Sequence, residues 1–82
     1  MDIKEIANAA RKEVPNGFYR HYKGNRYEVI GTAIHSETLE PMVIYRALYG
    51  VGEMWTRPAS MWNEMVSVNG ENVPRFAWTG EE

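Results

Sequence analysis

The sequence predicts a mainly β domain: an SH3-like small β-barrel of about five antiparallel strands, with an N-terminal α-helix and a short helical turn before the last strand. All ten Phe, Trp and Tyr residues lie between Phe18 and Trp78. Before residue 15, apolar residues recur at helical spacing, and afterwards short runs rich in Tyr, Val, Ile and Thr alternate with turn residues. Closing so small a sheet would remove its exposed edges, which favours a barrel.

The N-terminal segment predicts an α-helix over residues 3–13. Its apolar side chains fall on one stripe at helical spacing, namely Ile3, Ile6, Ala7, Ala10 and Val14. Asp2 and Glu5 have the arrangement of a capped helix start, and Pro15 with Gly17 predicts its end. Because the stripe is small, three roles stay open: a lid over one end of the barrel, an oligomer contact or a frayed appendage.

Five strands are expected after this helix. Their predicted ranges are residues 18–22, 26–35, 42–49, 53–57 and 74–78. Turn residues separate the first four, with Gly24, Pro41 and Gly50 at the breaks. Gly31 lies near the middle of the second strand, where the missing Cβ permits a bend or bulge.

Residues 58–66 interrupt the strand pattern. Pro58 suits the start of a helix, and residues four apart would share a helical face. Two such pairs occur, Met61 with Met65 and Trp62 with Val66. We therefore expect one or two helical turns here, followed by a turn at Asn69 and Gly70. The alternative architecture is an open, strongly twisted antiparallel sheet with the N-terminal helix packed across it.

Length and composition limit the function classes. With 82 residues the chain is one domain, divided into residues 1–16, the helix and turn, and residues 17–82, the barrel. It has no cysteine, which excludes disulfides, thiolate nucleophiles and zinc sites built on sulfur. Its net charge of −2 lacks the basic excess of a nucleic-acid binder. The acidic start and the lack of a long apolar run predict a cytoplasmic protein.

Six segments of the predicted β body resemble one known family. They are Gly17–Gly24, His35–Glu40, Val43–Gly50, Trp55–Pro58, Met61–Val66 and Pro74–Phe76. Together they are similar to the bacterial domain-of-unknown-function family numbered 1653, over about residues 17 to 78. The resemblance implies a small, mostly β bacterial domain, usually a whole short protein. It implies no activity and no catalytic residue.

The number of aromatic side chains predicts a ligand-binding groove, because a core of this size cannot hide ten large rings. We expect the groove to be formed by Tyr19, Tyr45, Trp55 and Arg57, with His21, His35 and Glu37 at its rim. Such a groove suits a peptide segment or a small anionic ligand, bound without chemical turnover. The competing interpretation is that the rings pack in the core and its rim.

The arginines of the β body allow two interpretations. Arg46, Arg57 and Arg75 would either bind an anionic ligand or pair internally with Glu28 or Glu64. We favour internal pairing. A partner of a different class, single-stranded nucleic acid, would use Arg20, Lys23 and Arg26 as a phosphate track, with Tyr19 and Tyr27 for stacking.

Catalysis would depend on the cluster that begins at His35. His35 and Glu37 are the candidates for acid-base chemistry, but residues 35–38 are more typical of a hairpin loop whose hydroxyls satisfy backbone groups. A metal site would need ligands from His21, His35, Glu37 and Glu40, and these lack any common ligand spacing. No triad, phosphate loop or cofactor motif is present, so we expect no catalytic residue, metal or cofactor.

Overall fold

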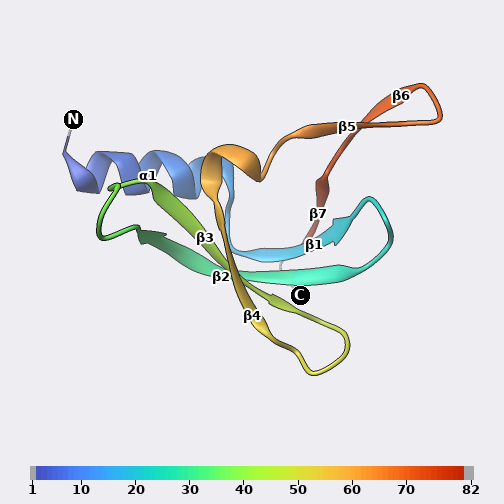
Figure 1. Ribbon diagram of the computed structural model, residues 1–82, viewed down its shortest axis with the longest axis horizontal. Helices are drawn as coiled ribbons and strands as arrows, with labels where there is room; N and C mark the ends of the chain where they lie inside the picture. The colour runs from blue at the N-terminus through green and yellow to red at the C-terminus, as the bar shows by residue number, and fades with distance from the viewer. Residues whose placement is uncertain (1, 81–82) are drawn as a thin grey trace.

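The main element of the fold is a five-stranded antiparallel sheet with the strand order β4-β3-β2-β1-β7 (Figure 1). A computed structural model describes residues 2–80 of the chain. The strands of the sheet are β1 (Gly17–His21), β2 (Arg26–Ile34), β3 (Pro41–Ala47), β4 (Met54–Pro58) and β7 (Phe76–Gly80). Each lies within two residues of its predicted range. Met1, Glu81 and Glu82, at the ends of the two predicted parts, lie outside the described residues.

The mainly β prediction is confirmed, but the predicted closure into a barrel is wrong. β4 and β7 are at opposite ends of the strand order, so the sheet is open. In Figure 1 the chain between β4 and β7 runs away from the sheet before it returns. This excursion separates the two strands that would have to pair to close a barrel. The alternative architecture, an open twisted sheet with the N-terminal helix packed on it, describes the fold.

Between β4 and β7 the predicted short helical turn is confirmed, but two strands that were not predicted follow it. The helical part is a single 3₁₀ turn, η1 (Ala59–Met61), and β5 (Met65–Val68) and β6 (Glu71–Pro74) then form a separate hairpin. The turn at Asn69 and Gly70 is confirmed, with φ of 53° and 84°, and two such residues in sequence favour a tight hairpin. In β5 and β6, β-branched valines alternate with other residues, as is typical of strands. This alternation outweighs the four-residue spacing of Met61 with Met65 and of Trp62 with Val66, which predicted a helix.

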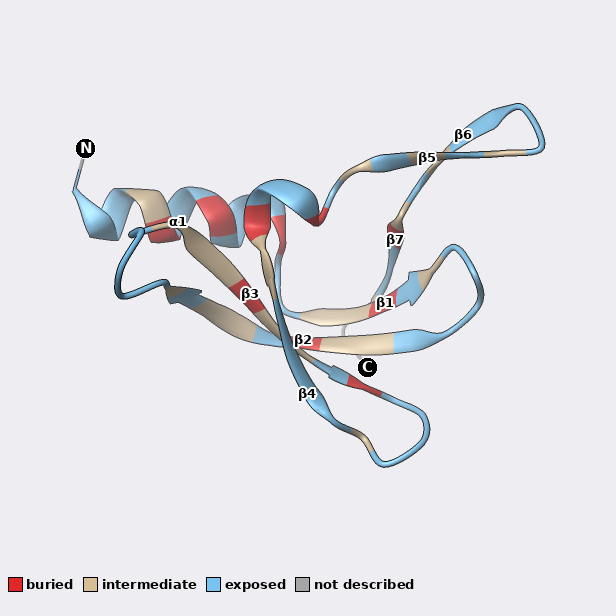
Figure 2. Ribbon diagram, in the orientation of Figure 1, coloured by how far each residue is buried: buried red, intermediate tan, exposed pale blue. Residues whose placement is uncertain are grey.

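The helix prediction is confirmed, since α1 spans Ile3–Glu13. Asp2 caps it: the backbone N–H of Glu5 donates to Asp2 Oδ1 at 2.9 Å. Ala7 and Ala10 are buried, and the helix packs on β2 and β3, so it covers one end of the core (Figure 2). Within residues 2–80, no helix has the length and apolar character needed to cross a membrane.

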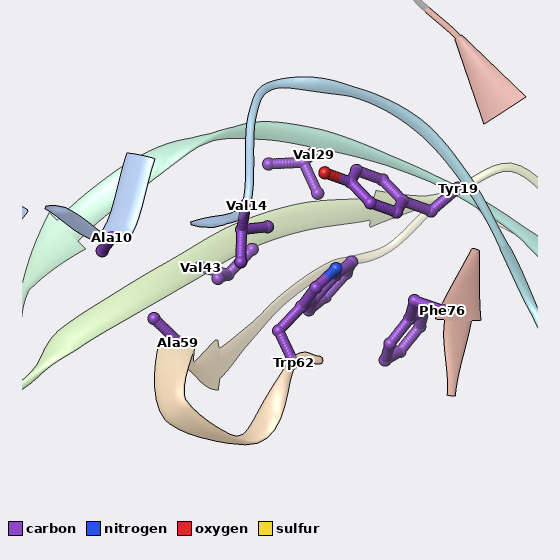
Figure 3. Close-up of a cluster of buried hydrophobic side chains, with 8 residues drawn as sticks. All are labelled: Ala10, Val14, Tyr19, Val29, Val43, Ala59, Trp62 and Phe76. Atoms are coloured by element: carbon purple, nitrogen blue, oxygen red, sulfur yellow. The ribbon is translucent and has the colours of Figure 1, made fainter. Parts of the chain in front are cut away.

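The core is built around Trp62, which follows η1 and is fully buried (Figure 3). Its ring stacks on Phe76, with centroids 3.9 Å apart and planes 8° apart. Tyr19 and Tyr45 pack against it edge-on, at 5.3 and 4.9 Å. Trp62 therefore joins strands that come from both ends of the chain. Small aliphatic side chains complete the cluster, namely Ala10, Val14, Val29, Val43 and Ala59.

Strand register divides the sheet into two faces. We call the side toward Trp62 the inner face. Register partners point to the same side, so the pairs Tyr45 with Trp55 and Val43 with Arg57 place β4 side chains on the inner face. The register shifts between Val29 and Gly31, which confirms the irregularity expected in β2. The other side, the outer face, carries the ion pair of Glu28 with Arg46.

Candidate functional site

Tyr19, the first of the predicted groove residues, belongs to the core. Only 3% of it is exposed. Its hydroxyl donates to the Pro15 carbonyl at 2.7 Å, and burial raises the pKa of Tyr19 to about 12. The ring also meets Trp78 edge-on at 5.4 Å. Tyr19 is therefore an inner-face residue that packs in the core and does not line a groove.

His35 and Glu37 lie away from the other candidates. His35 follows the end of β2. His21 lies near the other end of this strand, where its backbone N–H donates to the carbonyl of Asn25, the residue just before β2. The nine residues of β2 therefore separate the two histidines, a strand length of about 30 Å at roughly 3.3 Å per residue. His35 Nδ1 accepts from the N–H groups of Glu37 and Thr38 within an exposed turn. These bonds, and the bond from Glu40 N–H to the Thr38 hydroxyl, agree with the loop interpretation.

The other four predicted residues, His21, Tyr45, Trp55 and Arg57, lie on the inner face. Three of them meet around Phe76: its ring is 5.1 Å from His21, 6.1 Å from Tyr45 and 5.9 Å from the Arg57 guanidinium carbon. Tyr27 lies against the same ring at 5.7 Å. The rings of His21, Tyr27 and Tyr45 therefore surround the buried ring of Phe76 edge-on, and the partly buried Tyr27 and Tyr45 form an aromatic surface beside one guanidinium.

A second guanidinium completes this surface. Glu64 Oε1 lies 3.4 Å from an Arg57 terminal nitrogen and 3.5 Å from Arg75 Nε. Arg57 Nε also donates to the Met61 carbonyl at 3.1 Å, which holds its guanidinium in place. One carboxylate thus serves two guanidiniums and leaves a net positive charge. The favoured interpretation, internal pairing of the three arginines with Glu28 or Glu64, is confirmed: Arg46 pairs with Glu28, and Arg57 and Arg75 lie beside Glu64.

We call this group of side chains the ring–guanidinium surface. Its members are His21, Tyr27, Tyr45, Arg57, Glu64, Arg75 and Phe76. The sequence argument missed that Tyr27, Arg75 and Phe76 converge with His21. Alternation along β2 places Tyr27 on the same face as Val29, but only the pairing of β7 with β1 brings Phe76 to His21.

The pKa of His21 reflects the burial and the positive charges of this surface. Partial burial lowers its pKa, and the positive charges of Arg75, Lys23 and Arg57 lower it further. Its Nδ1 accepts the backbone N–H of Lys23 at 3.2 Å, so the neutral ring carries its proton on Nε2. A neutral imidazole among three cations indicates a site with a positive potential.

Trp55 lies farther along β4, beside a hollow of about 230 Å³ at the β3–β4 hairpin. Loop residues 50–53 line this open hollow together with Ala47, Tyr49 and Trp55. The Tyr49 hydroxyl is 2.7 Å from the Tyr27 hydroxyl, so the hairpin is tied to the ring–guanidinium surface. We call this space the hairpin hollow.

The proposed phosphate track lies on the other side of the sheet. Arg20 and Arg26 are register partners on the outer face, whereas Tyr19 and Tyr27, also partners, are on the inner face. A strand of nucleic acid that contacts the two arginines therefore does not reach these rings from the same side. Among residues 2–80, no three His, Asp or Glu side chains gather as metal ligands would.

Residues 17–78 match the family described as "Protein of unknown function (DUF1653)". The chain belongs to the DUF1653 family. A crystal structure of a DUF1653 protein from Bordetella bronchiseptica has 40% sequence identity to it and a TM-score of 0.79, covering 87% of this chain and 94% of that one. No curated protein matches the chain. The resemblance found in the sequence is thus confirmed, and DUF1653 membership adds no activity.

Proposed function

We propose that this DUF1653 protein is a binding module of the bacterial cytoplasm that holds its ligand without chemical turnover. The ligand, a peptide segment or a small molecule, carries an anionic group next to a flat apolar group. One observation carries the proposal: two guanidiniums share a single carboxylate at the margin of a partly open aromatic surface.

The geometry suits such a ligand. A guanidinium binds carboxylate or phosphate through paired N–H donors, and Arg57 is already positioned by the Met61 carbonyl. Arg75 Nε is buried 3.5 Å from Glu64 Oε1, but 28% of the Arg75 side chain is exposed, so this residue brings a second positive charge to the margin of the surface. The half-buried rings of Tyr27 and Tyr45 offer contact area at a low cost in side-chain entropy.

The test is a titration followed by NMR, with phenyl phosphate as the probe. Phenol and inorganic phosphate each supply half of the predicted chemistry and serve as controls. Phenyl phosphate should bind more tightly than either and raise the pKa of His21, because its charge offsets Arg57 and Arg75. Arg57→Gln should weaken binding at least fivefold. Arg46→Gln, which breaks an ion pair on the outer face, is the matched control and should leave binding unchanged.

Two results would contradict this proposal. Equal binding by the Arg57→Gln variant and the unaltered protein would remove the guanidinium from the site. A single-stranded oligonucleotide that shifts the signals of Arg20, Lys23 and Arg26, while phenyl phosphate shifts none near His21, would favour the nucleic-acid alternative. Binding to that track should weaken steeply as salt increases.

A further inference from the structure

The hairpin hollow has a construction of its own. Ala47, on the inner face of β3, forms its floor and is 4% exposed. The small Ala47 side chain leaves space above it. Val43 and Tyr45, the other inner-face residues in this part of β3, are larger. Gly50 and Gly52 have φ of 59° and 70°, so the loop curls over this floor without a Cβ in a strained conformation.

Two aromatic rings face solvent around this space. Trp55 is 53% exposed and Tyr49 46%, although both lie next to half-buried tyrosines. The hydrogen bond between the hydroxyls of Tyr49 and Tyr27 restrains the Tyr49 ring, and pairing with Tyr45 places Trp55 on the inner face. The Tyr49 wall is therefore held in place before any ligand arrives, which lowers the entropic cost of binding, and Trp55 lies on the same face.

The lining of the hollow carries a charge of one sign. Of its described lining residues, Glu53 alone is charged at neutral pH. The nearest inner-face cation on β4, Arg57, is held by Met61 and Glu64. Aromatic faces attract cations through their quadrupole, and a carboxylate adds to that attraction. At roughly 30 Å³ per water, the 230 Å³ volume has room for about seven waters, enough for a substituted ammonium group.

We propose that the hairpin hollow is a binding site for an alkylammonium group, held between Tyr49 and Trp55 and beside the Glu53 carboxylate. The methylene or methyl groups of the ligand contact the rings, and its positive charge faces the carboxylate. This chemistry occurs in free quaternary amines and in lysine or methylated lysine side chains. The site goes beyond the proposed function, because it uses different residues and takes a ligand group of opposite charge.

The test compares choline with its neutral isostere, 3,3-dimethyl-1-butanol, in NMR titrations. It follows the indole N–H signal of Trp55 and the backbone amide signals of loop residues 50–53, and the amide signals also report binding by the variant that lacks Trp55. Choline should give saturable shifts, and the isostere should bind at least fivefold more weakly because it lacks the charge. Glu53→Gln should weaken choline binding about threefold or more, and Trp55→Leu should abolish it while keeping an apolar wall. Glu71→Gln, on the separate β5–β6 hairpin, is the matched control and should change nothing.

A second set of probes separates the sources of the ligand group. A short peptide with one trimethyllysine, compared with the same peptide containing norleucine, tests a protein ligand. Tighter binding of the trimethyllysine peptide than of choline would indicate a side chain, and the reverse a free amine.

The proposal is overturned if the isostere binds as well as choline, if no alkylammonium probe shifts Trp55, or if the Trp55→Leu variant retains binding. Unchanged amide spectra of the variants establish that they are folded. Phenyl phosphate acts near His21 and choline near Trp55, so failure of one proposal is distinguishable from failure of the other.

Discussion

Truncation of two tryptophans, Trp62 and Trp55, should have very different effects on stability. Trp62 is 0% exposed and contacts three other rings, so Trp62→Ala leaves a cavity in the core and should cost about 3–5 kcal/mol. Trp55 leaves 53% of its surface in solvent on an edge strand and encloses no core space, so Trp55→Ala should cost about 1 kcal/mol.

Urea unfolding followed by far-UV circular dichroism measures both values in the same protein. A domain of this size has a total stability of about 4–12 kcal/mol, so Trp62→Ala should be largely unfolded or close to it. Trp55→Ala should keep a cooperative transition near that of the unaltered protein. The reasoning is refuted if the two variants lose similar free energies, or if Trp55→Ala is the more unstable. Either result would show that Trp55 belongs to the core and does not form the wall of a ligand site.

Three further predictions concern the helix, the β1–β7 contact and alkaline pH. Asp2→Ala removes the cap of α1 and should cost about 1 kcal/mol, measured by hydrogen exchange of the first helical turn. Gly17 has φ of 141°, and a Cβ there would lie 2.6 Å from the Trp78 ring, so Gly17→Ala should cost about 2 kcal/mol or more in thermal unfolding. Tyr19 has a pKa of about 12 in the folded protein, so between pH 10 and 12 it keeps a proton that it loses in the unfolded chain. The free energy of unfolding should therefore fall as the pH rises from 10 to 12. Urea midpoints across this range should fall more gently for Tyr19→Phe, and identical slopes would contradict the assignment.

The sequence predicted part of the ring–guanidinium surface, but it did not predict the hairpin hollow. The excess of large rings correctly predicted that some would remain exposed, and Tyr45, Trp55 and Arg57 were placed together on one face. His35 and Glu37 were expected at the same rim, but the length of β2 separates them from His21. Their nearness could not be judged from the sequence, because a position along a strand becomes a position in space only when strand pairing is known.

Arg75 and Phe76 illustrate the same difficulty. Both were visible as candidates for pairing or packing, yet they reach His21 only because β7 pairs with β1, more than fifty residues away in the chain. The hairpin hollow depends on a finer detail, the small side chain of Ala47 beneath two large rings. Side-chain size is evident in the sequence, but the space that it leaves depends on its neighbours across the strands.

Local features of this chain follow from a few neighbouring residues. The cap at Asp2, the apolar stripe of residues 3–13, the strand alternation and the turn at Asn69 and Gly70 all act over one or two turns of backbone, so the amino-acid order specifies them. Closure of the sheet does not. It depends on whether β4 and β7 meet, which is decided by packing between segments distant in the chain, and here the strands lie at opposite ends of the sheet with the β5–β6 hairpin between them in sequence. Both candidate sites lie on the inner face, which a closed barrel of this size would have filled with side chains.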